Sequence, residues 1–108
     1  MKTELAWAAG FLDGEGTFCI SWRKNKKSTK SYGYFRIRAS QSHREVLDRL
    51  KKIMGGSVTG PYPHSRGKSY FQFCLSKNAE NMFWKLFPYL SKVKRLQGGK
   101  AITALKKS

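Results

Sequence analysis

The residues that could carry chemistry gather in one short stretch near the start of the chain, residues 7–16, with the sequence WAAGFLDGEG. Thr3 and a glutamate precede it, and this pair is typical of the first turn of a helix. Two glycines then interrupt the helix and lead into residues 17–22, whose alternation of side chains predicts a strand. Glu15 is therefore expected at a helix-to-strand corner. A lone glutamate at a helix end is usually structural, so residue type alone gives Glu15 no reaction.

Small residues occupy one side of this helix. Ala6, Ala9 and Gly10 leave that side almost without side chains, so a second backbone could approach it closely, as small residues allow between packed helices. The alternative is that these residues fit beneath a sheet. The spacing is compatible with both interpretations, and both stay open at this point.

The charge of the chain indicates a polyanionic partner. Its 108 residues include 22 Lys and Arg against 6 Asp and Glu, which gives a formal charge of +16. Such a charge repels itself, whereas contacts with phosphates release counterions and contribute affinity. An anionic membrane is the competing partner, but no apolar run is long enough to span a bilayer and no basic amphipathic helix dominates. The length is that of one compact domain.

Neither the cysteines nor the histidine of the Pro-rich turn point to a metal site. Cys19 and Cys74 fall in expected strands without further ligands at metal spacing, so we expect free thiols. His64 has no neighbouring acid, His or Cys and is expected to contact DNA or solvent. No signal peptide precedes the first helix, and we expect a soluble intracellular protein.

The expected strands share one polar and basic face. Residues 34–40 alternate between an apolar side and a side that carries Tyr and Arg, and residues 57–59 and 68–76 are expected to form a second pair of strands. For the basic loop 23–31 we favour contact with the DNA backbone over a solvated loop. Sheets fit the major groove, where Arg is the commonest reader of guanine. The expected DNA-binding residues are Cys19, Ser21, Arg23, Lys24, Asn25, Lys26, Lys30, Tyr34, Arg36, Arg38, Thr59, Lys68, Tyr70 and Gln72.

Two further helices complete the expected order of elements. Residues 42–45, Ser-His-Arg-Glu, predict a capping box that opens a second helix, which a glycine pair ends. Asn78 is expected to cap a third helix over residues 79–87. The order predicts an α+β domain with a four-stranded antiparallel sheet backed by helices on one face. We place this domain at residues 1–97, followed by a basic tail, weakly helical or disordered, at 98–108.

Residues 8–16 resemble the motif of the LAGLIDADG homing endonucleases. Glu15 stands at the second acid of the motif, and the letters that are identical are Ala9, Gly10, Asp13 and Gly16. The order of elements resembles the single-motif branch over nearly the whole chain. In that branch two motif helices pack at a twofold axis, and the sheets form a saddle over the DNA. The resemblance implies an αββαββα homing endonuclease-like fold, with a dimer interface that contains Ala6, Ala9, Gly10 and Asp13.

The resemblance also implies a reaction and its residues. Glu15 falls on the metal-binding acid of the family, and the carbonyl of Ala9 is a further expected ligand. Two such carboxylates near the axis would be stabilised by a divalent cation, and the expected cofactor is Mg²⁺, two or more ions per dimer, with Mn²⁺ as a substitute. Gln41 resembles the polar residue near the attacking water, and Lys94 resembles the catalytic lysine. Each subunit of the homodimer would cut one strand of a pseudopalindromic double-stranded DNA site, leaving 3′ overhangs.

Other interpretations stay open from the sequence. A maturase or regulator of the same fold would bind DNA or RNA without cleavage, and loss of the motif acid would have signalled it. One half of a two-motif enzyme is disfavoured by the single motif and the complete set of elements. A ribosome-associated basic protein would not need the motif. Whether His43 or Arg44 adds a further basic group to the site is not decided.

Overall fold

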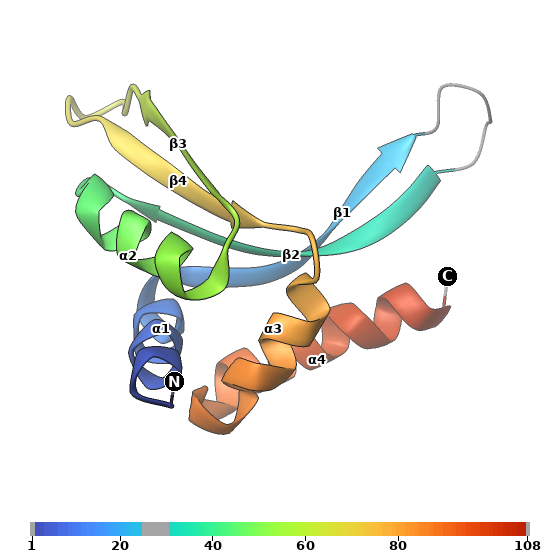
Figure 1. Ribbon diagram of the computed structural model, residues 1–108. Helices are drawn as coiled ribbons and strands as arrows, with labels where there is room; N and C mark the ends of the chain where they lie inside the picture. Colours follow the sequence, from blue (N-terminus) through green and yellow to red (C-terminus); the bar gives the residue numbers. More distant parts are fainter. Residues whose placement is uncertain (1, 25–30, 108) are drawn as a thin grey trace.

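The computed structural model describes residues 2–24 and 31–107, which form one antiparallel sheet backed by helices (Figure 1). The elements in order are α1 (Lys2–Glu15), β1 (Gly16–Lys24), β2 (Ser31–Gln41), α2 (Arg44–Met54), β3 (Ser57–Tyr62), β4 (Tyr70–Leu75), α3 (Ala79–Leu86), a 3₁₀ turn η1 (Phe87–Tyr89) and α4 (Lys92–Lys107). The expected α+β class and order of elements are confirmed. Asn25, Lys26 and Lys30 lie outside the described residues, as do the side chains of Arg23 and Lys24.

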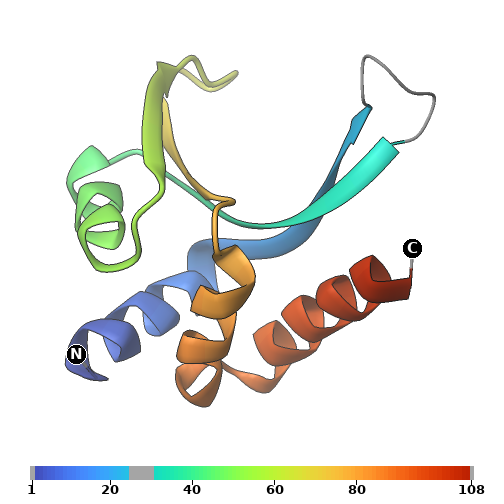
Figure 2. The same cartoon turned by 45° about the vertical axis from the view of Figure 1, so that its right-hand side comes forward.

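The sheet is bent into a saddle, with the strand order β1-β2-β4-β3. β2 pairs with β1 over residues 31–39 and with β4 over residues 37–41, so only residues 37–39 of β2 are paired on both sides. Outside residues 37–39, β2 is paired on one side only, and the outer ends of the two hairpins diverge (Figures 1 and 2). The concave face of the saddle is left without helices.

The second hairpin differs from the sequence prediction in its boundaries. β3 continues to Tyr62 through the Gly-Pro pair where a turn was expected, with a shift of register between Thr59 and Tyr62. A proline is tolerated there because β3 is an edge strand, where the missing N–H costs no ladder bond. β4 begins at Tyr70, so Lys68 lies in the turn and not in a strand.

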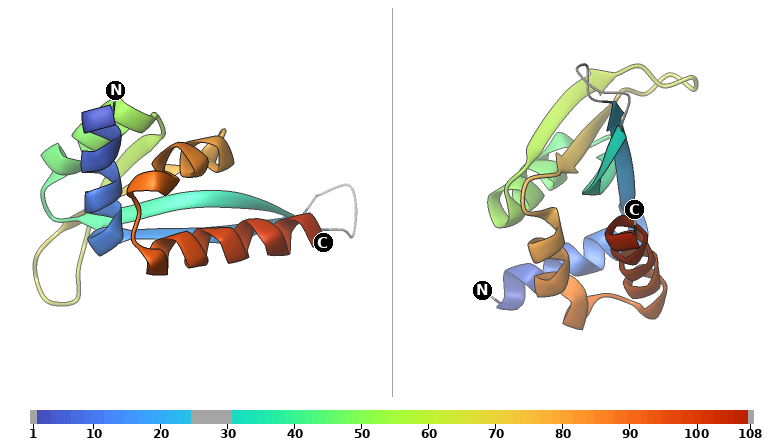
Figure 3. Two further views of the ribbon diagram at one scale, coloured as in Figure 1. Left: turned by 90° about the horizontal axis from the view of Figure 1, so that it is seen from below. Right: turned by 90° about the vertical axis from the view of Figure 1, so that its right-hand side faces the viewer.

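All the helices lie on the convex face of the sheet and cover its apolar side (Figure 3). Phe83 of α3 packs edge to face against Phe18 of β1 and Phe35 of β2, with ring centroids 5.2 and 5.7 Å apart. These three rings are at most 5% exposed, and they join the α3 helix to the middle of the sheet. No helix in residues 2–24 and 31–107 is long and apolar enough to cross a membrane.

The helices α2 and α3 begin near the expected residues, but not by the expected capping. His43, and not Ser42, precedes the first turn of α2, and no side chain caps it. Ser42 instead donates from its N and Oγ to Oε1 of Gln41, at 2.9 and 3.3 Å. Asn78 precedes α3 in a left-handed conformation without a side-chain capping bond. The predicted capping box is therefore wrong. The position of each helix depends instead on the packing of its apolar stripe against the sheet.

The C-terminal segment is part of the packed fold. α4 runs without interruption to Lys107, so residues 98–107 do not form a separate tail. Gly98 is buried, and a Cβ added there would collide with the ring of Phe83, whereas a Cβ on Gly99 would meet nothing within 4 Å. The glycine pair thus permits close packing at one position and ends no helix.

These two adjacent glycines give a matched prediction for stability. Gly98→Ala should lower the free energy of unfolding by about 1–3 kcal/mol, because the new methyl group overpacks the contact with Phe83. Gly99→Ala should raise it by about 0.5–1 kcal/mol, because alanine favours the helix at a position with open space. Urea unfolding followed by circular dichroism measures both. Equal effects of the two changes would contradict the packing described.

Candidate active site

The motif residues meet at the corner where α1 passes directly into β1. α1 ends at Glu15, and Gly16 is the first residue of β1. A Cβ on Gly16 would lie 2.6 Å from Cδ2 and 2.8 Å from the carbonyl oxygen of Leu12, a fully buried side chain, so glycine is required for this abrupt change of direction. Glu15 is exposed, and among the described residues its carboxylate has no hydrogen-bond or ion-pair partner.

The electrostatics of this corner favour a bound cation. The C-terminal end of a helix carries partial negative charge, and an acid placed there costs about 0.3–1 kcal/mol. The last turn of α1 nevertheless contains Asp13 and Glu15 and no basic residue. The carbonyls of this last turn also lack partners within the helix. The corner therefore combines a free carboxylate with open carbonyl oxygens, the ligand chemistry of Mg²⁺.

α4 brings a lysine to the same corner. Nζ of Lys94, which is half-buried, donates to the carbonyl oxygen of Gly16 at 2.6 Å. Three residues further along α4, Oε1 of Gln97 accepts the backbone N–H of Phe18 at 2.9 Å. Because β1 is an edge strand, this amide would otherwise face solvent. Both contacts hold α4 against the first residues of β1, beside Glu15.

Asp13 anchors the start of α4. Its Oδ1 and Oδ2 accept the backbone N–H of Ser91 at 3.0 and 3.2 Å, so a carboxylate from α1 satisfies an amide at the N-terminal end of α4. Asp13, Ser91 and Gln97 therefore position Lys94. Ser91 and Gln97 were not predicted from the sequence, although the spacing of residues 91, 94, 98 and 102 marks one face of a helix.

The anchor gives a prediction for stability. Asp13→Ala should lower the free energy of unfolding by about 1–2 kcal/mol, because the amide at the start of α4 loses its charged acceptor. Asp48→Ala is the matched control, since Asp48 makes an exposed ion pair with Arg44 at 3.5 Å and should cost less than about 0.5 kcal/mol. Urea unfolding of both variants measures the difference. A loss at Asp13 no larger than at Asp48 would contradict the anchoring role.

The register of the sheet places Gln41 near this corner, but the structure does not bring Ala9 to it. Gly16 pairs with Ala39, so Gln41 lies two residues beyond the point where β1 begins. Ala9 lies six residues before Glu15, about 9 Å along the helix axis, and its carbonyl is inside the helix. Glu15 and Lys94 therefore lie at the corner, and the register places the backbone of Gln41 at the adjoining end of β2.

The exposed side of α1 agrees only in part with the expected dimer interface. Ala6 and Gly10 are exposed, and Gly10 has open space around it. Ala9 is fully buried in the core of its own chain, which is the alternative considered for the small residues. Gly14, four residues after Gly10, is also exposed and extends the strip of small residues toward Glu15.

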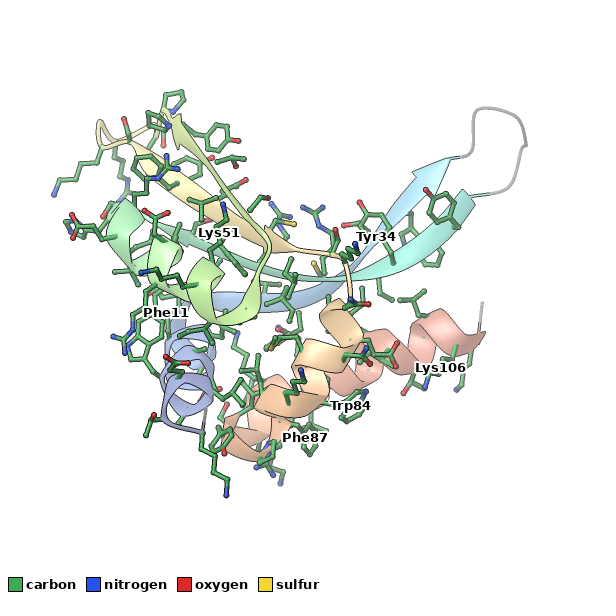
Figure 4. All side chains as sticks on the ribbon, in the orientation of Figure 1. Phe11, Tyr34, Lys51, Trp84, Phe87 and Lys106 are labelled. Carbon is green, nitrogen blue, oxygen red and sulfur yellow. The ribbon has the colours of Figure 1, made fainter. Side chains whose placement is uncertain are left out.

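The open face of the sheet carries the polar residues expected to contact DNA. The side chains that alternate with the buried Phe18, Ile37 and Phe73 point away from the helices. In Figure 4, Tyr34 lies on the strand side, while Trp84 and Phe87 lie among the helices. The expected residues on this face are Cys19, Ser21, Tyr34, Arg36, Arg38, Thr59, Tyr70 and Gln72, with the exposed Lys68 in the turn beside it.

Both cysteines on this face are free thiols, as expected. Cys74 accepts hydrogen bonds from Nε and Nη2 of Arg36 at 3.2 and 2.9 Å, and Ser21 Oγ accepts one from Nη1 at 2.9 Å. The hydrogen bonds to Cys74 raise the pKa of Arg36 above its usual value, against the opposing effect of burial. Arg36 is therefore a fixed cation on the open face.

One copy of the chain supplies few metal ligands. Within residues 2–24 and 31–107, no three His, Cys, Asp or Glu side chains come together. At the α1–β1 corner Asp13 is engaged with Ser91, which leaves Glu15 as the available carboxylate of the corner. The carboxylate and carbonyl oxygens present fit a hard divalent cation, and a second copy of the corner would double their number.

The bent sheet, the helices on its convex face and the acid at the α1–β1 corner define the class of protein. A family model described as LAGLIDADG endonuclease matches residues 8–106, and the chain belongs to this family. Homing endonuclease I-CvuI, solved with the I-CreI target and magnesium, is similar with a TM-score of 0.77 and 25% identity over 98% of this chain and 68% of that chain. A second I-CvuI structure, with its own target and calcium, gives 0.77 and 26% over the same shares.

Homing endonuclease I-TnaI shares the fold, with a TM-score of 0.73 and 24% identity over 94% of this chain and 71% of that chain. No curated protein sequence matches the chain. The family and the fold therefore rest on the family model and on these solved structures. The resemblance seen in residues 8–16 is confirmed over almost the entire chain.

Proposed function

We propose that this protein is a site-specific homing endonuclease that hydrolyses both strands of double-stranded DNA with a divalent metal ion. The observation that carries the proposal is the α1–β1 corner, where Glu15, exposed and without a partner among the described residues, lies beside a lysine that reaches the Gly16 carbonyl. The charge of +16 and the polar open face of the sheet supply the surface for DNA. The I-CvuI complexes with magnesium and calcium support the choice of a divalent cation.

The active form is a homodimer in this proposal. Each corner offers one free carboxylate, and the exposed Ala6 and Gly10 allow the α1 helices of two copies to approach closely. A twofold axis beside α1 would bring two Glu15 side chains together, and a metal ion would relieve their repulsion. Twofold symmetry in the protein favours a pseudopalindromic site in the DNA.

The residues of the corner have separate roles. Glu15 binds the metal, with Mg²⁺ as the expected ion, two or more per dimer, and Mn²⁺ as a substitute. When bound, such an ion supplies a water of lowered pKa and stabilises charge on the leaving oxygen. The ammonium group of Lys94 stabilises the charge that develops on the scissile phosphate. The amide of Gln41, held by Ser42, orients the attacking water, and each subunit cuts one strand to leave 3′ overhangs.

Cleavage of a randomised duplex library tests this function. The protein is incubated with the library in Mg²⁺, in Mn²⁺ and in EDTA, and the DNA ends are sequenced. We expect recurrent staggered ends in both metals and none in EDTA. A sequence that is enriched by binding but stays intact in both metals would show a binding protein of this fold, and would contradict the enzyme.

A further inference from the structure

The guanidinium group of Arg36 is held from two sides on the open face of the sheet. Arg36 is in β2, opposite Cys19 of β1, and its side chain reaches diagonally to Ser21 of β1 and to Cys74 of β4, which is opposite Arg38. Its Nε and Nη2 form one fork that donates to Sγ of Cys74, and its Nη1 donates to Oγ of Ser21. The ring of Tyr34 lies 6.0 Å from the guanidinium carbon. Three strand residues around it therefore fix the plane of this group before any ligand binds.

The hydrogen bonds leave part of Arg36 available. A guanidinium group has five N–H donors, and the three bonds to Cys74 and Ser21 use three of them. Within the part of the chain that the structure describes, one N–H on each terminal nitrogen is left without a partner. One remaining donor on each terminal nitrogen of a fixed planar group can serve the O6 and N7 acceptors of guanine in the major groove.

Neither of the residues that accept hydrogen bonds from Arg36 is a carboxylate. A carboxylate in place of Cys74 would orient the guanidinium and also cancel its charge, whereas a thiol and a hydroxyl orient it and leave the charge in place. Both ion pairs among the described residues lie elsewhere, at Arg44 and Lys106. The positive charge of Arg36 is thus kept for an anionic or strongly accepting ligand.

Arg38 provides the contrast on the same strand and the same face. It lies two residues further along β2, between Thr17 and Cys74 in the register. Arg38 is exposed, and among the described residues its side chain has no hydrogen-bond or ion-pair partner. A free arginine loses side-chain entropy when it binds one base edge, and a held arginine has already lost it.

We propose that Arg36 determines specificity by reading a guanine at one position of each half-site, with Cys74 and Ser21 as the residues that position it. The inference rests on the proposed binding of double-stranded DNA and adds to it the identity of one base. It assigns Cys74 a role in recognition, although its thiol need not touch the DNA. Arg38 on this account contributes affinity through phosphate or solvent-bridged contacts, without a fixed base preference.

Selection of bound duplexes from a randomised library, in Ca²⁺ so that the readout is binding, tests the inference. Wild-type protein should enrich guanine at one symmetry-related position. Arg36→Lys, which keeps the charge and removes the fork, should lower the preference for guanine there by roughly 10- to 100-fold and leave the other positions unchanged. Arg38→Lys is the matched control and should leave that position as it is.

The positioning role is tested by a conservative pair at Cys74. Cys74→Val removes the acceptor and should weaken the guanine preference at that position several-fold, while Cys74→Ser keeps an acceptor and should retain it. The ¹H–¹⁵N signal of Arg36 Nε in the free protein should show slow hydrogen exchange in wild type and Cys74→Ser, and fast exchange in Cys74→Val. Thermal melting checks that each variant is folded.

The outcomes separate this inference from the proposed function. If cleavage occurs but Arg36→Lys keeps the guanine preference, or Cys74→Val exchanges Nε–H as slowly as wild type, the inference is overturned and the enzyme stands. If the guanine preference depends on Arg36 and Cys74 but no metal supports cleavage, the inference stands and the enzyme is overturned. If wild-type protein enriches no sequence, both are overturned.

Discussion

Glu15→Gln is expected to reduce the rate of DNA cleavage by roughly 10³-fold or more, because an amide is a poor ligand for a divalent cation and the metal supplies the activated water. The side chain is exposed and has no partner among the described residues, so the change should not disturb the fold. Affinity for DNA should be equal or higher, since one negative charge is removed from a surface that binds a polyanion. Single-turnover cleavage and binding in Ca²⁺, on the sequence selected from the library, measure the two effects.

Glu4→Gln is the matched control for this prediction. Glu4 is an exposed acid in the first turn of the same helix, at the end far from β1. It should cleave as wild type does, with at most a small loss of stability from the helix dipole. Equal losses of cleavage in both variants, or full cleavage by Glu15→Gln, would contradict the role given to Glu15.

Lys94→Met is expected to lower the cleavage rate by roughly 10²- to 10³-fold, because the site loses the positive charge that stabilises the scissile phosphate in the transition state. Methionine is chosen since it keeps most of the aliphatic length of lysine at a half-buried position. Affinity for DNA should fall only as much as the loss of any one surface charge requires. Rapid-quench cleavage at saturating protein measures the rate without the contribution of binding.

Lys92→Met controls for charge on the same helix. Lys92 is exposed in the first turn of α4 and, in contrast to Lys94, has no contact with the corner among the described residues. Its loss should reduce affinity by a similar small factor and leave the saturated rate unchanged. If Lys94→Met cleaves at the rate of Lys92→Met, then Lys94 has a structural role through Gly16 and no catalytic one.

The sequence was sufficient for the parts of the fold that depend on local pattern. The alternation in residues 34–40 places Phe35 and Ile37 in the core and Arg36 and Arg38 on the open face. Successive side chains of a strand point to opposite faces of the sheet, so the apolar residues must share one face and the arginines the other. The motif acid and the glycine after it predicted the α1–β1 corner in the same way. Local pattern also predicted four strands and their order along the chain, but not their order β1-β2-β4-β3 in the sheet.

Features that depend on tertiary contacts could not be obtained in this way. A Gly-Gly pair ordinarily ends a helix, but α4 continues through it. Residue 98 is a glycine because the ring of Phe83 occupies the space that a Cβ would need. The capping box at Ser42 satisfied the pattern, but Gln41 competes for the hydroxyl and the amide of Ser42. A short motif shows which hydrogen bonds and conformations are available to a residue, and tertiary packing determines which of them forms.

In the candidate site too, some residues were predicted from the sequence and others depend on tertiary contacts. Glu15 and Lys94 were expected from the family resemblance, and the structure adds the contact between Lys94 and Gly16. Asp13 was expected at a dimer interface, yet its carboxylate binds the start of α4. The contact of Arg36 with Cys74 joins strands that are far apart in sequence, so no spacing in the sequence could indicate it.

The position of the two cuts on the selected DNA site tests the central claim most directly. Both strands of the site are sequenced to their ends after incubation with Mg²⁺, with wild-type protein and Glu15→Gln in parallel. The account predicts one cut in each strand, placed symmetrically about the centre of a pseudopalindrome and staggered to leave 3′ overhangs, and no cuts with Glu15→Gln. Scattered ends, or the same ends with Glu15→Gln, would contradict it.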